Sequence, residues 1–169
     1  YRTVGNRNGA AVLLLHGTNQ SGAAHLTADN AGELFGAGQP LDAATHFIIM
    51  PDGIGHGSSS KPSDGLRMHF PKYDYDDMVR AQHQLLVEGL KVDRLQLLMG
   101  TSMGAMHAWD WGYMYPAFAS GLVPLASTPV EIAGRNRIWR KFLMDAIELD
   151  PSWNNGNYTE QPRSAKFAA

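Results

Sequence analysis

Four short apolar runs, each bounded by turn-forming residues, dominate the hydrophobic pattern of the chain. They cover residues 11–15, 47–50, 95–99 and 121–125, and the fourth is the weakest. The first ends at His16-Gly17, the second at Pro51 and the third at Gly100. Apolar runs of this length are typical of strands that are buried on both faces of a sheet.

Helical patterns fill most of the intervals between these runs. The spacing of apolar residues predicts helices over 31–35, 75–90, 103–115 and 134–149. Asp74 or Asp76 is suited to cap the second helix, and Pro116 stops the third. Alternating strands and helices predict an α/β fold with a mostly parallel sheet and helices on both faces. The polar stretch 152–169 is expected to be a loop.

Composition narrows the class of protein. The 169 residues, 44% hydrophobic and 18% charged, favour one compact domain or a large piece of one, and argue against disorder. A net charge of −2 without a basic stripe argues against a nucleic-acid partner. No apolar run approaches about 18 residues, so no membrane partner is expected.

Cysteine content and the chain start bear on chemistry and compartment. There is no cysteine, which excludes disulfides and thiolate ligands. No secretory leader is visible, and a cytoplasmic location is the default expectation. Because the chain opens at Tyr1 without a methionine, a secreted or periplasmic location stays open.

The strongest motif is Gly100-Thr101-Ser102-Met103-Gly104, which matches G-x-S-x-G between an apolar run and a helical pattern. In this context the serine stands on a sharp strand-to-helix turn with its hydroxyl exposed. The crowded turn tolerates only small residues at the two flanking positions, here Gly100 and Gly104. We therefore predict that Ser102 is a catalytic nucleophile and that both glycines support the turn.

A second motif, His16-Gly17-Thr18, ends the first apolar run. In a fold with such a serine, one oxyanion donor is the amide after the nucleophile, here Met103, and the other comes from a loop after an earlier strand. Gly17 lets the backbone approach a substrate, so the amide of Thr18 is our candidate for the second donor. We expect the His16 side chain to organise this loop rather than to act as a base.

The remaining motifs are weaker. The glycine-rich segment 52–58 follows the second run and is interpreted as a shaped loop beside the site rather than a dinucleotide-binding turn. The seven histidines form no H-x-x-x-H or H-E-x-x-H pair, so neither a metal nor another cofactor is expected. His107, five residues after Ser102, is interpreted as a packing residue.

Taken together, these motifs resemble the α/β-hydrolase superfamily, and in particular its homoserine O-acetyltransferase-like branch. The similar segments are residues 102–106, 124–127 and 150–158. The branch usually has proline and glycine where this chain has Thr101 and Ala105. It also carries an arginine in the helix that matches 134–149, and Met144 lies nearer that place than Arg137 or Arg140. These departures favour a related ester or lactone hydrolase.

The resemblance also implies that part of the machinery lies elsewhere. A serine needs a base, and in this fold the order is serine, acid, then histidine. The only histidine after Ser102 is His107. We therefore expect the base and acid beyond Ala169, residues 1–129 to form the N-terminal part of the hydrolase core, and 130–169 to begin a cap. The 169 residues alone are expected to be inactive.

Three functions follow as alternatives. The first is a serine hydrolase that acts on a carboxylic ester or lactone through an acyl-enzyme on Ser102. The second is an O-acyltransferase of the homoserine O-acetyltransferase type, and the third is a non-catalytic member that binds a ligand or protein. The expected partner is a small-molecule ester or acyl donor, and a homodimer is left open.

Overall fold

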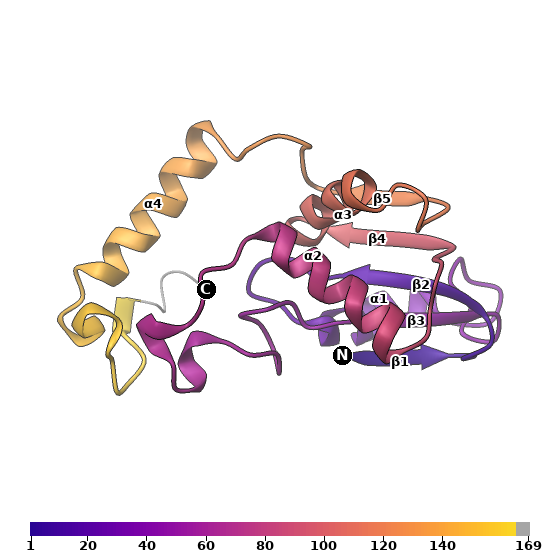
Figure 1. The fold of residues 1–169 in the computed structure, drawn as a ribbon, viewed down its shortest axis with the longest axis horizontal. Coiled ribbons are helices and arrows are strands. Elements are labelled where there is room, and N and C mark those ends of the chain that lie inside the picture. The colour runs from indigo at the N-terminus through magenta and orange to yellow at the C-terminus, as the bar shows by residue number, and fades with distance from the viewer. Residues whose placement is uncertain (165–169) are drawn as a thin grey trace. The chain divides into compact units, whose positions relative to one another are not determined.

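A five-stranded mixed sheet forms the centre of the computed structural model, which describes residues 1–164 (Figure 1). The strand order is β1-β3-β2-β4-β5, with β1 antiparallel to β3 and all other pairs parallel. The strands are β1 (Arg2–Gly5), β2 (Ala10–Leu15), β3 (His46–Met50), β4 (Leu97–Thr101) and β5 (Leu122–Leu125). The four expected strands are therefore present, and the α/β class is confirmed.

Four α-helices connect or follow the strands. They are α1 (Ala28–Leu34), α2 (Tyr75–Gln84), α3 (Met103–Met114) and α4 (Gly134–Glu148). A short π-helix over Leu85–Gly89 extends α2. Asp74 caps the start of α2 in a reciprocal capping box with Asp77. No helix among residues 1–164 has the length and apolar character needed to cross a membrane.

Two details of the sequence prediction were wrong. Residues 151–156 form a 3₁₀ helix (Pro151–Gly156) where a loop was expected, while residues 165–169 lie outside the described part. The strand β1 was not predicted, because its four residues alternate between half-buried and exposed positions and carry no apolar run. It is held at the sheet edge by pairing with β3, a long-range contact.

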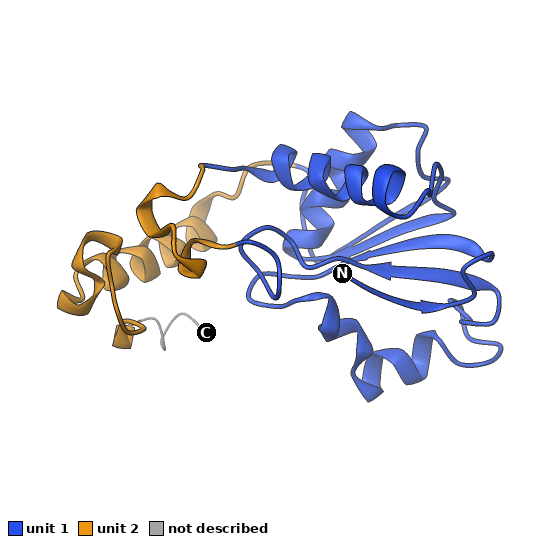
Figure 2. Ribbon diagram, turned by 60° about the horizontal axis from the view of Figure 1, so that its bottom comes forward, with its two compact units in different colours: residues 1–60, 72–129 blue, residues 61–71, 130–169 orange. Residues whose placement is uncertain are grey.

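The apolar runs bury alternate side chains on the two faces of the sheet, as expected from the strand period of two. Leu13 and Leu15 of β2 pack with residues of α2 and α3. Val12 and Leu14 face the opposite way and pack against the segment of α1 and Phe35. Figure 2 shows helices on both sides of the sheet.

The chain divides into two compact units (Figure 2). The first, called the sheet unit here, comprises residues 1–60 and 72–129 and contains the whole sheet. The second, called the helical unit, combines the segment 61–71 with the chain from Val130 onward and contains α4. That the helical unit is a cap stays a prediction.

Within the helical unit, the segment 61–71 packs against the turn that follows α4. The Arg67 guanidinium lies 4.3 Å from the ring centre of Tyr158, and that ring stacks on Trp153. Gly156 lies against Met68. These contacts join two segments that are far apart in sequence.

Candidate active site

Ser102 lies between the end of β4 and the start of α3 with a strained backbone, φ 54° and ψ −111°. A positive φ is uncommon for a residue with a side chain, and it persists only where neighbouring structure holds it. The Ser102 amide donates to the Leu125 carbonyl at 2.9 Å. The Ser102 carbonyl accepts from the amides of Ala105 and Met106, so both sides of the turn are fixed.

Glycine is required on both sides of Ser102 because the backbone packs closely there. A Cβ at Gly100 would lie 2.1 Å from the Gly104 carbonyl oxygen. A Cβ at Gly104 would lie 2.3 Å from the carbonyl oxygen of Leu15, on β2. No side chain fits at such distances, which explains both glycines of the motif by steric contact.

The loop after β2 lies beside Ser102. A Cβ at Gly17 would be 3.6 Å from Cβ of Ser102, an ordinary van der Waals separation. The Gly17 amide donates to Oε1 of Gln20 at 3.0 Å and is therefore occupied. Within residues 1–164, no hydrogen bond uses the amide of Thr18, which is exposed.

Met103 supplies the other amide of interest. It is the first residue of α3, and the first N–H groups of a helix have no carbonyl partner within the helix. The positive end of the helix dipole lies at this point, which favours a developing negative charge. The amides of Met103, next to Ser102 in the chain, and of Thr18, in the loop beside it, are therefore the candidate donors to an acceptor.

His16 organises the loop, as the sequence suggested. Its Nε2 accepts from the Gly53 amide at 3.0 Å, so the proton of the neutral ring is on Nδ1, which donates to the Gly17 carbonyl at 2.8 Å. Burial lowers the pKa of His16, which keeps the ring neutral at neutral pH. Both ring nitrogens are used, and neither is left to serve as a base.

Asp52 is a second organiser, and sequence reasoning missed its role. The buried carboxylate accepts from the amides of Gly22 and Ser58 and from the Arg2 guanidinium at 2.8–2.9 Å. Burial would raise the pKa of Asp52, but these donors outweigh it and hold the pKa below the usual range. Asp52 thereby ties β1, the start of a 3₁₀ turn and the glycine-rich loop together. The sequence signal was an acid two residues after an apolar run.

A buried polar chain lies behind the turn, between α2 and α3. The Trp111 indole donates to Oε1 of Gln82 at 2.8 Å, so the Gln82 amide nitrogen donates to Nδ1 of His107 at 3.3 Å. His107 is 1% exposed, and burial lowers its pKa to about 4. This supports the interpretation of His107 as a packing residue.

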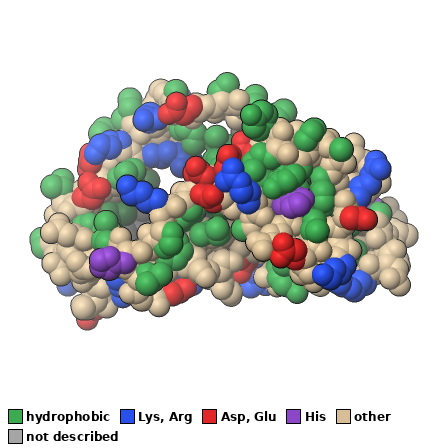
Figure 3. All heavy atoms as spheres, viewed as in Figure 1, with side chains coloured by type: hydrophobic (Ala, Val, Ile, Leu, Met, Phe, Trp, Pro, Cys, Tyr) green, Lys and Arg blue, Asp and Glu red, His purple; other side chains and the backbone are tan. Residues whose placement is uncertain are grey.

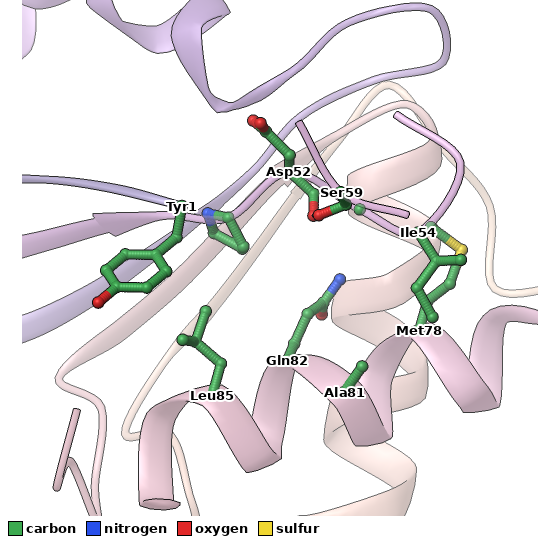
Figure 4. Close-up of a pocket in the computed structure, with 10 residues that line it drawn as sticks. Tyr1, Asp52, Ile54, Ser59, Met78, Ala81, Gln82 and Leu85 are labelled. Carbon is green, nitrogen blue, oxygen red and sulfur yellow. The ribbon is translucent and has the colours of Figure 1, made fainter. Parts of the chain in front are cut away.

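In the described part of the sheet unit, cavities lie at the carboxyl ends of β3, β4 and β5. One, of ≈ 230 Å³, lies between the loop after β3 and α2; Figure 4 shows Gln82 and Met78 reaching toward it from the helix, opposite Asp52 and Ser59. The other, of ≈ 290 Å³, is lined by Thr101 and Leu125 at the ends of β4 and β5. Both belong to the sheet unit.

The described residues do not include a base for Ser102. No histidine of residues 1–164 hydrogen-bonds its hydroxyl, and that part of the chain contains no cluster of His, Asp or Glu that could hold a metal ion. Of the predicted site residues, the fold brings together Ser102, Met103, both glycines and the His16–Thr18 loop.

Known proteins of similar sequence include acyl-transferring enzymes. A homoserine O-acetyltransferase of Moorella thermoacetica is 34% identical over 189 residues, an alignment that covers 96% of this chain and 48% of that protein. The chain spans about half the length of the curated relatives it matches.

Solved structures with the same fold include hydrolases. The acetyl esterase MekB superposes with a TM-score of 0.82 at 28% identity, covering 94% of this chain and 46% of its own. An acetylester hydrolase from Corynebacterium glutamicum gives the same TM-score at 26% identity, again over 94% of this chain and 46% of its own. A family model described as the alpha/beta hydrolase fold matches residues 10–166. The chain therefore belongs to the α/β hydrolase fold family and resembles its homoserine O-acetyltransferase-like branch.

Proposed function

We propose that this chain carries the nucleophile and the oxyanion hole of a serine hydrolase that cleaves a carboxylic ester or lactone. The observation that carries the proposal is the strained φ of 54° at Ser102. It lies between Gly100 and Gly104, two positions where the packed backbone leaves no room for a side chain. Strained backbone at residues with side chains clusters at functional sites.

In the proposed reaction, Oγ of Ser102 attacks the ester carbonyl carbon while a base accepts the hydroxyl proton. The carbonyl oxygen becomes an oxyanion and accepts hydrogen bonds from the amides of Met103 and Thr18. The C–O bond to the alcohol then breaks, and the alcohol leaves with the proton held by the base. Water attacks the acyl-enzyme, which releases the acid and restores the serine.

The base and its orienting acid are proposed to come from residues outside this chain. His16 and His107 are engaged in the contacts described above, through Gly53 and Gly17 in one case and through Gln82 in the other. We accordingly expect the 169-residue chain alone not to turn over esters.

A second candidate function is acyl transfer, in which an alcohol takes the place of water. The homoserine O-acetyltransferases among the relatives favour it, and the acetyl esterases among the solved structures favour hydrolysis. Both candidates share the acyl-enzyme on Ser102. Because both groups of similar proteins handle acetyl groups, a short acyl group is the proposed substrate moiety.

The test is covalent labelling of the full-length protein with a fluorophosphonate probe. We expect labelling at Ser102, its loss in Ser102→Ala, and a fall in kcat on the order of 10⁶-fold in that variant. Ser120→Ala is the matched control, because this side chain lies apart from the turn in a hydrogen bond with Arg94. Labelling that persists in Ser102→Ala would refute the assignment. No labelling of the wild-type protein would favour the non-catalytic alternative.

The two catalytic candidates are separated by product analysis. The full-length protein is incubated with an acetyl ester, with and without a simple alcohol acceptor, and the products are identified by mass spectrometry. Free acid in both samples supports the hydrolase, and a new ester that forms at the expense of acid supports the transferase.

A further inference from the structure

The cavity of ≈ 230 Å³ between the loop after β3 and helix α2 has the form of a small-molecule site, and we call it the α2 cavity (Figure 4). Its apolar lining comes from the loop and from one side of α2 and its π-helical extension, and comprises Pro51, Ile54, Met78, Ala81 and Leu85. An apolar cavity of about 150 Å³ binds benzene, so the α2 cavity has room for a somewhat larger molecule. Small-molecule sites are usually concave and mainly apolar, with a few polar groups that fix the orientation of the ligand.

Gln82 brings a buried hydrogen-bond donor to this lining. The residue is 5% exposed, and Figure 4 shows its amide nitrogen pointing into the cavity, toward the side that carries Ser59. The nitrogen has two hydrogens, and one of them is donated to Nδ1 of His107 at 3.3 Å. Among the described residues, no hydrogen bond uses the other hydrogen. Because a buried donor without a partner is costly, the cavity favours an occupant with a hydrogen-bond acceptor.

Ser59 offers the complementary group on the facing side of the cavity. Its hydroxyl donates to the Asp52 carbonyl at 2.6 Å, which uses its only hydrogen. The lone pairs that remain on Oγ can accept a hydrogen bond, but the group has nothing left to donate. A ligand between Gln82 and Ser59 must therefore accept on one side and donate on the other, as a single alcohol oxygen does.

The charges around the cavity favour an uncharged ligand. Among the described lining residues, Asp52 has the one acidic or basic side chain; its carboxylate already accepts from three donors, and Figure 4 shows it turned away from Gln82. On the other side of α2, Arg80 pairs with Asp76 and Asp77. Figure 3 shows acidic and basic side chains next to one another on the surface over α2. The charged groups of this region are thus paired outside the cavity.

Both sides of the cavity are held in place before a ligand arrives. The Trp111 indole donates to Oε1 of Gln82 at 2.8 Å, which fixes the amide on α2. The Gly53 amide donates to Nε2 of His16 at 3.0 Å, which fixes the loop on the facing side. A preformed site loses less free energy on binding, because fewer groups must be ordered.

We propose that the α2 cavity binds a small uncharged alcohol with an apolar body, whose oxygen accepts from Gln82 and whose hydroxyl donates to Oγ of Ser59. The cavity belongs to the sheet unit, and its lining includes neither Ser102 nor the His16–Thr18 loop. Binding at this site therefore does not require the chemistry proposed for Ser102.

The first test compares cyclohexanol with cyclohexanone, an alcohol and a ketone of nearly the same size, on the full-length protein. Neither contains an ester, so neither is a substrate for the proposed hydrolysis. Titrations followed by ligand-observed NMR should give about fivefold tighter binding of the alcohol, because the ketone cannot donate to Ser59. In Ser59→Ala the alcohol should bind as weakly as the ketone, and the affinity for the ketone should be unchanged. Equal affinities of the wild-type protein for the two compounds would overturn the proposal.

The second test blocks the cavity. Ala81 is exposed on α2 and lines the cavity, so Ala81→Phe should weaken binding of both compounds about tenfold or more. Arg80→Phe is the matched control: its side chain is 55% exposed and lies about 160° around α2 from Gln82, so the affinities should be unchanged. Circular dichroism reports whether both variants are folded, and if Ala81→Phe does not fold, the comparison in Ser59→Ala still decides.

Two further outcomes would contradict the site. Binding that is unchanged in a folded Ala81→Phe protein would mean that the compounds bind elsewhere. No binding to the wild-type protein would mean that the full-length chain fills the cavity itself.

Discussion

The sheet unit and the helical unit differ in whether their apolar side chains are covered. In the sheet unit, Val12, Leu13 and Leu14 are consecutive and all 0% exposed, because helices cover both faces of their strand. In the helical unit, α4 buries none of its residues, and large apolar side chains such as Trp139 and Phe142 are exposed. An apolar pattern therefore identifies a surface that needs covering, and the tertiary structure determines whether the same unit supplies the cover.

The two units should differ most in how closely their backbone is packed. The stability of a Gly104→Ala variant tests this difference. Gly104→Ala places a methyl group against the Leu15 carbonyl, which cannot move without disturbing β2, so we expect a loss of about 4 kcal/mol or more in unfolding free energy. The counterpart in the helical unit is Gly156→Ala. There the new methyl group meets the flexible Met68 side chain, and the φ of Gly156 is +84°. We expect a loss of about 1–2 kcal/mol in unfolding free energy.

Chemical denaturation of both variants measures the difference. A Gly104→Ala protein as stable as the wild type would show that the serine turn is looser than described. A loss in Gly156→Ala as large as in Gly104→Ala would show that the helical unit is packed as tightly as the sheet unit.

Leucine truncation sharpens the comparison at the level of burial. Leu14→Ala removes a fully buried side chain from the sheet and should cost about 3 kcal/mol. Leu149→Ala removes a side chain that is 82% exposed, and it should change stability by less than about 0.5 kcal/mol. Equal losses in the two variants would contradict the exposure of Leu149.

Acid sensitivity near neutral pH should be a smaller effect than the loss in Leu14→Ala, and it arises in the sheet unit. Burial lowers the pKa of His25 and of His107 to about 4, from an ordinary value of 6.5. The unfolded chain therefore binds more protons between these values, and stability falls as the pH drops from about 6.5 toward 4. Between pH 7 and pH 6 we expect a loss of roughly 1 kcal/mol in total.

Denaturation curves at several pH values check this prediction. A variant with both His25→Gln and His107→Gln should show a flatter dependence over the same interval. A slope that is unchanged in this variant would assign the acid sensitivity to other groups.

Much of the sheet unit was predictable because its signals are local. Four apolar runs identified four strands, although β4 continues two residues past the expected end and carries Gly100 and Thr101. The G-x-S-x-G motif predicted a tight turn at Ser102. Its first glycine is needed because Gly100 packs against Gly104, and its second because Gly104 packs against Leu15. The role of Ser102 in catalysis remains a prediction.

Long-range pairing was not predictable from local pattern. The strand β1 has no apolar run of its own and exists through its ladder with β3. Asp52 gathers donors from residues 50 positions before it and six after it, which no spacing rule indicates. The segment 61–71 joins the helical unit through Arg67, which contacts Tyr158, and Met68, which contacts Gly156, and these partners are distant in sequence.

The sequence by itself determined which segments become strands and helices and where a serine could stand on a tight turn, because those properties depend on neighbours a few residues away. Only the tertiary structure decided that the loop holding Thr18 lies beside Ser102, that the ring nitrogens of His16 are both occupied, and that no residue of α4 is buried in its own unit. Those outcomes depend on the packing of distant segments, in which burial and hydrogen-bond geometry select among many arrangements that the same local pattern allows.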